Sequence, residues 1–302
     1  SILNAYGTEL NQTVRTGGST GTLAVIAESG GDTIVINAGA LATTDIAATG
    51  YAPLNFNGNN YSAVTVFGMG GADTIDLTNL GSGQSAALAI TLDGDTADDT
   101  GTATNGDASA DTLRVRATGL STGNVTLLGG DGDDIVEVGV GTTDGILGQV
   151  IVLGEGGADS LTVNNSSSLN ADVSTVDEDS ISTETGRNAA DDVTYNGVET
   201  LSVLTSSIAD TVTVNFTPNL TAGTVVTTAT VNGAGGNDTI LLQNANDPQL
   251  TRLNLLGDAG SDTFGNALVP GPKVVPSVTT TIVVSGGINT VPPTGTTATA
   301  NP

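Results

Sequence analysis

Aspartates that follow glycine-rich turns are the residues of this sequence whose type and spacing could do chemistry. One turn reads Gly129-Gly130-Asp131-Gly132-Asp133-Asp134 and places three carboxylates within four residues. Calcium prefers about six to eight hard oxygen ligands, which aspartate side chains and the carbonyls of glycine turns supply. The pattern therefore predicts calcium sites, and the candidate ligands are Asp131, Asp133, Asp134, Asp258, Asp262, Asp73, Asp159 and Asp238.

The same aspartates have a structural alternative. Each could cap its own turn by accepting hydrogen bonds from backbone N–H groups. A separate acidic stretch with Asp93, Asp95, Asp98 and Asp99 is a further candidate for calcium, although its spacing does not fit an EF-hand. The formal charge of −26 is self-repelling, and divalent cations would relieve that repulsion.

Composition excludes several classes of function. The 302 residues include no Cys and no His, which excludes disulfides, zinc or iron–sulfur sites, and nucleophile systems that need a His base. Six scattered basic residues against 32 acidic ones argue against a nucleic-acid partner. No apolar run approaches the ~20 residues that a membrane span needs, so we expect no membrane insertion. Arg114 and Arg116 share one face of a predicted strand, and we expect them to pair with acidic neighbours rather than to catalyse a reaction.

One unit recurs along the chain: a strand, a glycine-rich turn, an aspartate and a second strand. Aliphatic residues stand two and four positions after most of these marker aspartates, with polar residues between them. This period of two is typical of a strand with one buried face. The markers are Asp32, Asp73, Asp111, Asp134, Asp159, Asp210, Asp238 and Asp262.

The spacing of the markers predicts an all-β fold. The shortest spacings are 23 to 28 residues, which suits one coil of a parallel β-helix (β-solenoid) of stacked Gly/Asp-rich turns. A β-sandwich is the alternative, because the pairs Asn57-Gly58, Asn105-Gly106 and Asn196-Gly197 are typical of hairpins.

The chain is predicted to have a body and an arm. Residues 1–268 form the solenoid body, with surface-loop insertions at 93–111 and 165–192 that are rich in acidic residues. Residues 269–302 form a Pro/Thr-rich C-terminal arm with one isolated strand at 278–284.

Two resemblances concern location and ions. The segment Gly129 to Glu137, GGDGDDIVE, fits the nonapeptide G-G-x-G-x-D-x-U-x and resembles the calcium-binding repeats of RTX (hemolysin-type) secreted proteins. That resemblance implies calcium held between coils, although here the turns come singly and 23 or more residues apart. The run from Val193 to Leu242 is similar to repetitive surface proteins of planctomycete-like bacteria, which implies an exported location.

These observations together predict a structural protein and no enzyme. We expect a subunit of an extracellular bacterial filament, sheath or surface layer that assembles head-to-tail with copies of itself, with strand 278–284 as a donor and calcium as a stabiliser. A monomeric calcium-dependent adhesin at the cell surface, binding a glycan, is the alternative. A β-helical polysaccharide-active enzyme is third, because paired carboxylates are plentiful but aromatic platforms are few.

Overall fold

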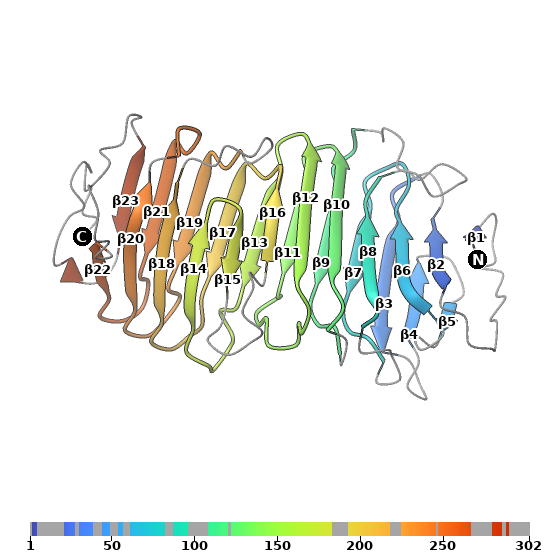
Figure 1. Ribbon diagram of the computed structural model, residues 1–302, viewed down its shortest axis with the longest axis horizontal. Coiled ribbons are helices and arrows are strands. Elements are labelled where there is room, and N and C mark those ends of the chain that lie inside the picture. Colours follow the sequence, from blue (N-terminus) through green and yellow to red (C-terminus); the bar gives the residue numbers. More distant parts are fainter. Residues whose placement is uncertain are drawn as a thin grey trace. The chain divides into compact units, whose positions relative to one another are not determined.

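The computed structural model describes most of the chain, and its regular elements are all β-strands (Figure 1). The described residues are 2–4, 21–27, 30–38, 44–48, 54–56, 61–81, 87–95, 108–119, 122–182, 193–217, 225–245, 247–266, 280–285 and 288–289, and they contain no helix. The all-β class predicted from the sequence is therefore confirmed. The chain divides into two compact units, residues 1–140 with 144–160 and residues 141–143 with 161–302.

The first unit holds two mostly parallel sheets. One has the strand order β1 (Ile2–Asn4), β2 (Gly21–Ile26), β6 (Tyr61–Phe67), β8 (Ala89–Asp93), β10 (Val125–Asp131) and β12 (Val150–Gly156). The other has the order β11 (Ile135–Val138), β9 (Thr112–Val115), β7 (Thr74–Leu77), β3 (Thr33–Ala38), β4 (Thr44–Ala48) and β5 (Leu54–Phe56). From β6 to β12 the chain alternates between the two sheets, while β4 and β5 pair antiparallel at one end.

The second unit repeats this arrangement. One sheet has the order β16 (Val193–Asn196), β15 (Ser180–Ser182), β14 (Val173–Asp177), β18 (Thr211–Phe216), β20 (Thr239–Ala245), β22 (Thr263–Asn266) and β24 (Ile288–Asn289). The other has the order β23 (Thr281–Ser285), β21 (Arg252–Leu256), β19 (Thr228–Asn232), β17 (Thr200–Leu204) and β13 (Ser160–Asn164). Only β14–β15 and β15–β16 pair antiparallel among the strand pairs of this unit whose register is determined.

The interior of each unit is built from the aliphatic positions that the repeat predicted. Val64 and Val66 of β6, for example, are at most 1% exposed. Full burial of one such side chain contributes about 1.5–3 kcal/mol relative to exposure. The positions two and four residues after the markers are likewise buried: Ile34, Ile36, Ile75, Leu77, Leu113, Val115, Val136, Val138, Leu161, Val163, Val212, Val214, Ile240 and Leu242.

The structure describes only part of the two predicted surface loops, and the described parts contain buried aspartates. In the 93–111 stretch, Asp93, Asp95 and Asp111 are buried, and residues 96–107 lie outside the described part. The 165–192 stretch forms β14 and β15 and buries Asp172 up to its last described residue, 182. In the 165–192 stretch, β14 pairs in parallel with β18 and antiparallel with β15.

The Asn-Gly pair that the structure describes does not form a hairpin. Gly197 has a φ of 68°, and the chain passes there from β16 in one sheet to β17 in the other. Glycine tolerates this left-handed conformation, which explains the residue type. The pairs Asn57-Gly58 and Asn105-Gly106 lie outside the described residues.

The strand expected at 278–284 is not isolated. It lies at 281–285 as β23 and pairs in parallel with β21, with Thr281 opposite Arg252 and Ser285 opposite Leu256. Its inward side chains Ile282 and Val284 are buried. This strand therefore extends the sheet of its own unit.

Candidate functional site: a ladder of buried aspartates

The marker aspartates of the first unit form a continuous ladder of hydrogen bonds. The backbone N–H of Asp73 donates to Oδ1 of Asp111 over 2.7 Å, and the N–H of Asp111 donates to Oδ1 of Asp134 over 2.7 Å. The N–H of Asp134 donates in turn to Oδ1 of Asp159 over 2.8 Å, and the N–H of Asp32 donates to Asp73. Four of the aspartates thus accept from the marker of the preceding repeat: Asp73, Asp111, Asp134 and Asp159.

The second unit has a ladder of the same kind. The N–H of Asp172 donates to Oδ1 of Asp210 over 2.7 Å, and the N–H of Asp210 donates to Oδ1 of Asp238 over 2.9 Å. The N–H of Asp238 donates to Oδ1 of Asp262 over 3.0 Å. All four of these aspartates are at most 3% exposed.

At the start of each strand, the hydrogen bond to the aspartate side chain adds one more bond to the row of backbone hydrogen bonds that joins the two neighbouring strands. The carbonyl of Asp111 accepts from the N–H of Ile135, one residue beyond Asp134, over 2.8 Å. The N–H of Asp111 would otherwise be a buried donor without a partner, which costs about 1–3 kcal/mol. The carboxylate thus accepts a bond from the adjacent repeat, and Asp210 also accepts one within its own turn, from Oγ of Ser206 over 2.7 Å.

A glycine five residues before the aspartate makes room for the other carboxylate oxygen. A β-carbon on Gly68 would lie 2.6 Å from Oδ2 of Asp73, and one on Gly129 or Gly233 would overlap Oδ2 of the marker that follows. The first insertion preserves this contact, because Gly94 takes the same place against Asp111 although 17 positions separate them. The recurring glycine is thus explained by steric fit to the carboxylate.

Two further turn positions have a positive φ. The position two residues before the marker is glycine in each of five turns, with φ from 114° to 152°, at Gly71, Gly132, Gly157, Gly236 and Gly260. The position four residues before the marker is left-handed even where it is not glycine. It is Met69 at 76°, Glu155 at 71°, Ala234 at 60°, Asp258 at 53° and Gly130 at 101°.

Burial raises the pKa of three aspartates of the two ladders, Asp111, Asp134 and Asp238. Loss of solvent is the main cause that raises the pKa of Asp111 to about 7, against the N–H bond from Asp73, which lowers it. Burial likewise raises the pKa of Asp238 to about 6 and raises that of Asp134. Oδ2 of Asp111, Asp134, Asp210, Asp238 and Asp262 is buried and has no hydrogen-bond partner within the described part of the chain.

The remaining predicted calcium residues lie on the surface of the turns. Asp131 and Asp133 are exposed; the N–H of Asp131 donates to Oδ2 of Asp95, and Oδ1 of Asp133 accepts from the N–H of Ala158 over 2.9 Å. Exposed Asp258 accepts from Nδ2 of Asn232 over 2.9 Å. Asp98 and Asp99 lie outside the described residues.

The structure separates the candidate calcium residues by role and assembles no ligand set from them. The ladder takes Asp73, Asp134, Asp159, Asp238 and Asp262, one on each coil. Within the described residues no group of three or more acidic side chains is arranged to hold a metal ion. Calcium binding stays a prediction, and no residue is assigned to it.

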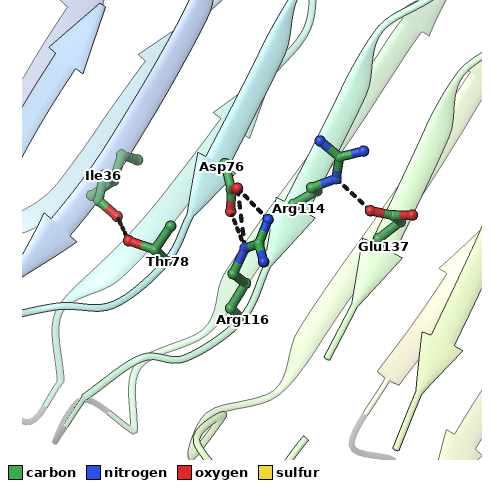
Figure 2. Close-up of polar contacts among 6 residues, drawn as sticks. All are labelled: Ile36, Asp76, Thr78, Arg114, Arg116 and Glu137. Atoms are coloured by element: carbon green, nitrogen blue, oxygen red, sulfur yellow. Dashed lines mark hydrogen bonds and ion pairs between the residues drawn. The ribbon is translucent and has the colours of Figure 1, made fainter. Parts of the chain in front are cut away.

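Arg114 on β9 and Arg116, which directly follows it, pair with acidic residues of the neighbouring strands, as expected (Figure 2). Arg114 forms an ion pair with Glu137 of β11, and Nη2 of Arg116 lies 2.7 Å from Oδ2 of Asp76 on β7. Nε of Arg116 also donates to Oδ1 of Asp76 over 2.9 Å, so this contact is bidentate. These pairs join three coils on the outer face of one sheet.

Sequence reasoning missed Asp172 as a ladder member. Its turn contains serine in place of glycine, and its second following residue is Ser174, so the aliphatic pattern fails there. The signal that could have found it is Ser168, four residues before the marker, because Ser206 stands at the same place before Asp210. Both serines are buried, and each accepts a backbone N–H two residues further on.

No family model, no curated protein and no solved structure matches this chain. The described residues contain no helix that is long and apolar enough to cross a membrane.

Proposed function

We propose that this chain is a structural subunit of an extracellular bacterial filament, sheath or surface layer, folded as a parallel β-solenoid. The parallel pairing of successive coils and the one-per-coil ladder of aspartates support the solenoid. The acidic, Cys-free composition supports an exported location. In this proposal the chain works by assembling with copies of itself.

The observation that carries the proposal is the outer edge of β23. β23 ends the order of its sheet, so no described strand pairs with the edge that faces away from β21. Unpaired N–H and C=O groups at such an edge are a template for a strand of another chain. Because β23 pairs with β21 of its own chain, its free edge is the place where we propose that a strand of another copy adds.

The backbone directions along β23 support edge pairing. The N–H of Thr281 donates to the carbonyl of Thr251 over 2.9 Å, and the carbonyl of Ser285 accepts from the N–H of Gly257 over 2.9 Å. Residues alternate in direction along a strand, so Ile282 and Val284 direct their N–H and C=O groups away from β21. The strand therefore offers two residues to a partner without losing a bond of its own.

Electron microscopy of the purified chain, in calcium and in excess EGTA, tests this function. Filaments or sheets in calcium are the expected result, and their loss in EGTA would add calcium as a stabiliser. Assemblies that ignore EGTA would support the structural role without calcium. Dispersed particles in both conditions would contradict the proposal and favour the monomeric adhesin, which a glycan screen would then examine.

A further inference from the structure

We propose that the ladder segment formed by Asp73, Asp111 and Asp134 binds protons at mildly acidic pH, so that the coils of the first unit are held more tightly as the medium acidifies. This inference goes beyond the assembly role, because it gives the fold a response to pH. It rests on how the three carboxyl groups are enclosed and on which charges surround them.

The three carboxyl groups lie one above another inside the unit. Asp111 is 1% exposed and lies between the other two: it accepts the N–H of Asp73 and donates its own N–H to Asp134, each over 2.7 Å. Adjacent strands of a sheet are about 4.8 Å apart, so ionisation of all three would place like charges at about that spacing in a buried site. A proton on the middle group removes both repulsions.

Every charged group that influences Asp111 is acidic. Asp73 faces it from the coil before β7, Asp134 from the coil before β11, and Asp95 from the turn after β8. Arg114 of β9 and Arg116 directly after it are engaged with Glu137 and Asp76 on the outer face. Asp111 has no ion pair with a basic residue of the described chain.

Asp134 has equally acidic surroundings. Asp131 and Asp133 approach it from its own turn, Glu155 approaches from the turn of β12, and Asp159 accepts its N–H. No ion pair with a basic residue of the described chain neutralises it. The turn that ends at Asp134 and the end of β12 therefore both add negative charge around the Asp134 carboxyl group.

The ladder bond does not require the charge. Oδ1 of Asp111 accepts the N–H whether or not Oδ2 carries a proton, and Oδ2 is buried without a hydrogen-bond partner. Protonation at Oδ2 thus neutralises a costly buried charge and leaves the coil-to-coil bond in place. The raised pKa of Asp111, about 7, agrees with this geometry.

The composition of the chain leaves few groups that titrate near neutral pH, which makes a titration experiment easy to interpret. The sequence has no His and no Cys, so in the unfolded chain only the terminal amine, with a pKa of about 7.7–8.0, titrates near neutrality. Potentiometric titration of the dispersed folded chain is compared with the same chain in urea, both in high salt to screen surface repulsion. We expect the folded chain to release additional protons between about pH 5.5 and 7.5. Superimposed curves across this window would overturn the proposal.

Two variants assign the protons. Asp111→Asn keeps an Oδ1 acceptor for the N–H of Asp73 and removes the titrating group, and we expect it to lose about one of the extra protons. Asp258→Asn removes the same charge from an exposed turn residue of the second unit and is expected to keep them. Equal loss in both variants would contradict an assignment to the buried ladder. Should Asp111→Asn fail to fold, residue-assigned ¹³C detection of the wild-type carboxyl groups gives the same answer: a midpoint near 7 is expected at Asp111, and a midpoint near 4 at that residue would refute the proposal.

Discussion

Replacement of Gly233 by alanine tests the steric argument for the recurring glycine. A β-carbon there would overlap Oδ2 of Asp238 and lie 2.9 Å from its Cγ, so the carboxyl group must move. Gly235, in the same turn, is the matched control: a β-carbon on it would meet nothing closer than 3.5 Å. One turn thus offers a forbidden and an allowed site for the same methyl group.

The expected cost of Gly233→Ala has two parts. Movement of the carboxyl group breaks its bond to the N–H of Asp210 and leaves that buried donor unpaired, which costs about 1–3 kcal/mol. The inserted methyl group overpacks the turn for about 1–3 kcal/mol more. We therefore expect a loss of about 2–5 kcal/mol in the free energy of unfolding. Gly235→Ala is expected to be neutral or to stabilise the chain by about 0.4–1 kcal/mol, because it restricts the unfolded state.

Urea unfolding followed by far-UV circular dichroism measures both variants, and hydrogen exchange locates the damage. The amide of Asp210 is expected to exchange faster in Gly233→Ala and at the wild-type rate in Gly235→Ala. Adding Asp238→Ala to Gly233→Ala removes the overlap, so the two changes together are expected to cost less than their sum. Stabilities of the two glycine variants that agree within about 0.5 kcal/mol would refute the steric reasoning.

Three further predictions concern backbone strain, ion pairing and pH. Ala234→Gly relieves a left-handed residue and is expected to stabilise the chain by about 0.5–1 kcal/mol in calorimetry, whereas Ala259→Gly, whose φ is not positive, gains nothing. A double-mutant cycle on Arg116 and Asp76, whose side chains are 40% and 12% exposed, is expected to give a coupling of about 0.5–1 kcal/mol that salt weakens; a coupling near zero would contradict a stabilising pair. The pKa of Asp238 rises from 3.8 to about 6, so its protonated form is favoured by folding and its contribution, present below pH 3.8, is lost as the pH rises through about 6. Tm in high salt is therefore expected to be higher at pH 5 than at pH 8, and the opposite order would refute the sign.

The repeating burial pattern could be predicted because a strand alternates its faces. Val212 and Val214 stand two and four residues after Asp210, and both are fully buried as predicted. The alternation identified the inner face without any knowledge of the pairing. It could not identify β14, because Val173 points outward and Ser174 inward, which reverses the expected order of apolar and polar residues.

The role of the aspartates could not be predicted from one turn at a time. A turn such as the one that ends at Asp134 satisfies a calcium-repeat pattern locally, yet its acceptor Oδ1 binds the N–H of Asp111, 23 residues earlier. That partner follows from the stacking of coils, which spacing alone leaves undetermined. The same reason hid the purpose of Gly129, whose missing β-carbon matters only because of where the Asp134 carboxyl group lies.

The most direct test of assembly through β23 is sedimentation velocity over a rising protein concentration. Val284→Pro removes an N–H that points away from β21, and proline is tolerated on an edge strand. Val284→Ala truncates the same buried side chain but keeps that N–H, and so serves as the control. We predict that the wild type and Val284→Ala form species that grow with concentration while Val284→Pro stays dispersed. Equal growth in all three chains would contradict edge pairing at β23, and a single small species for the wild type at every concentration would contradict the structural role itself.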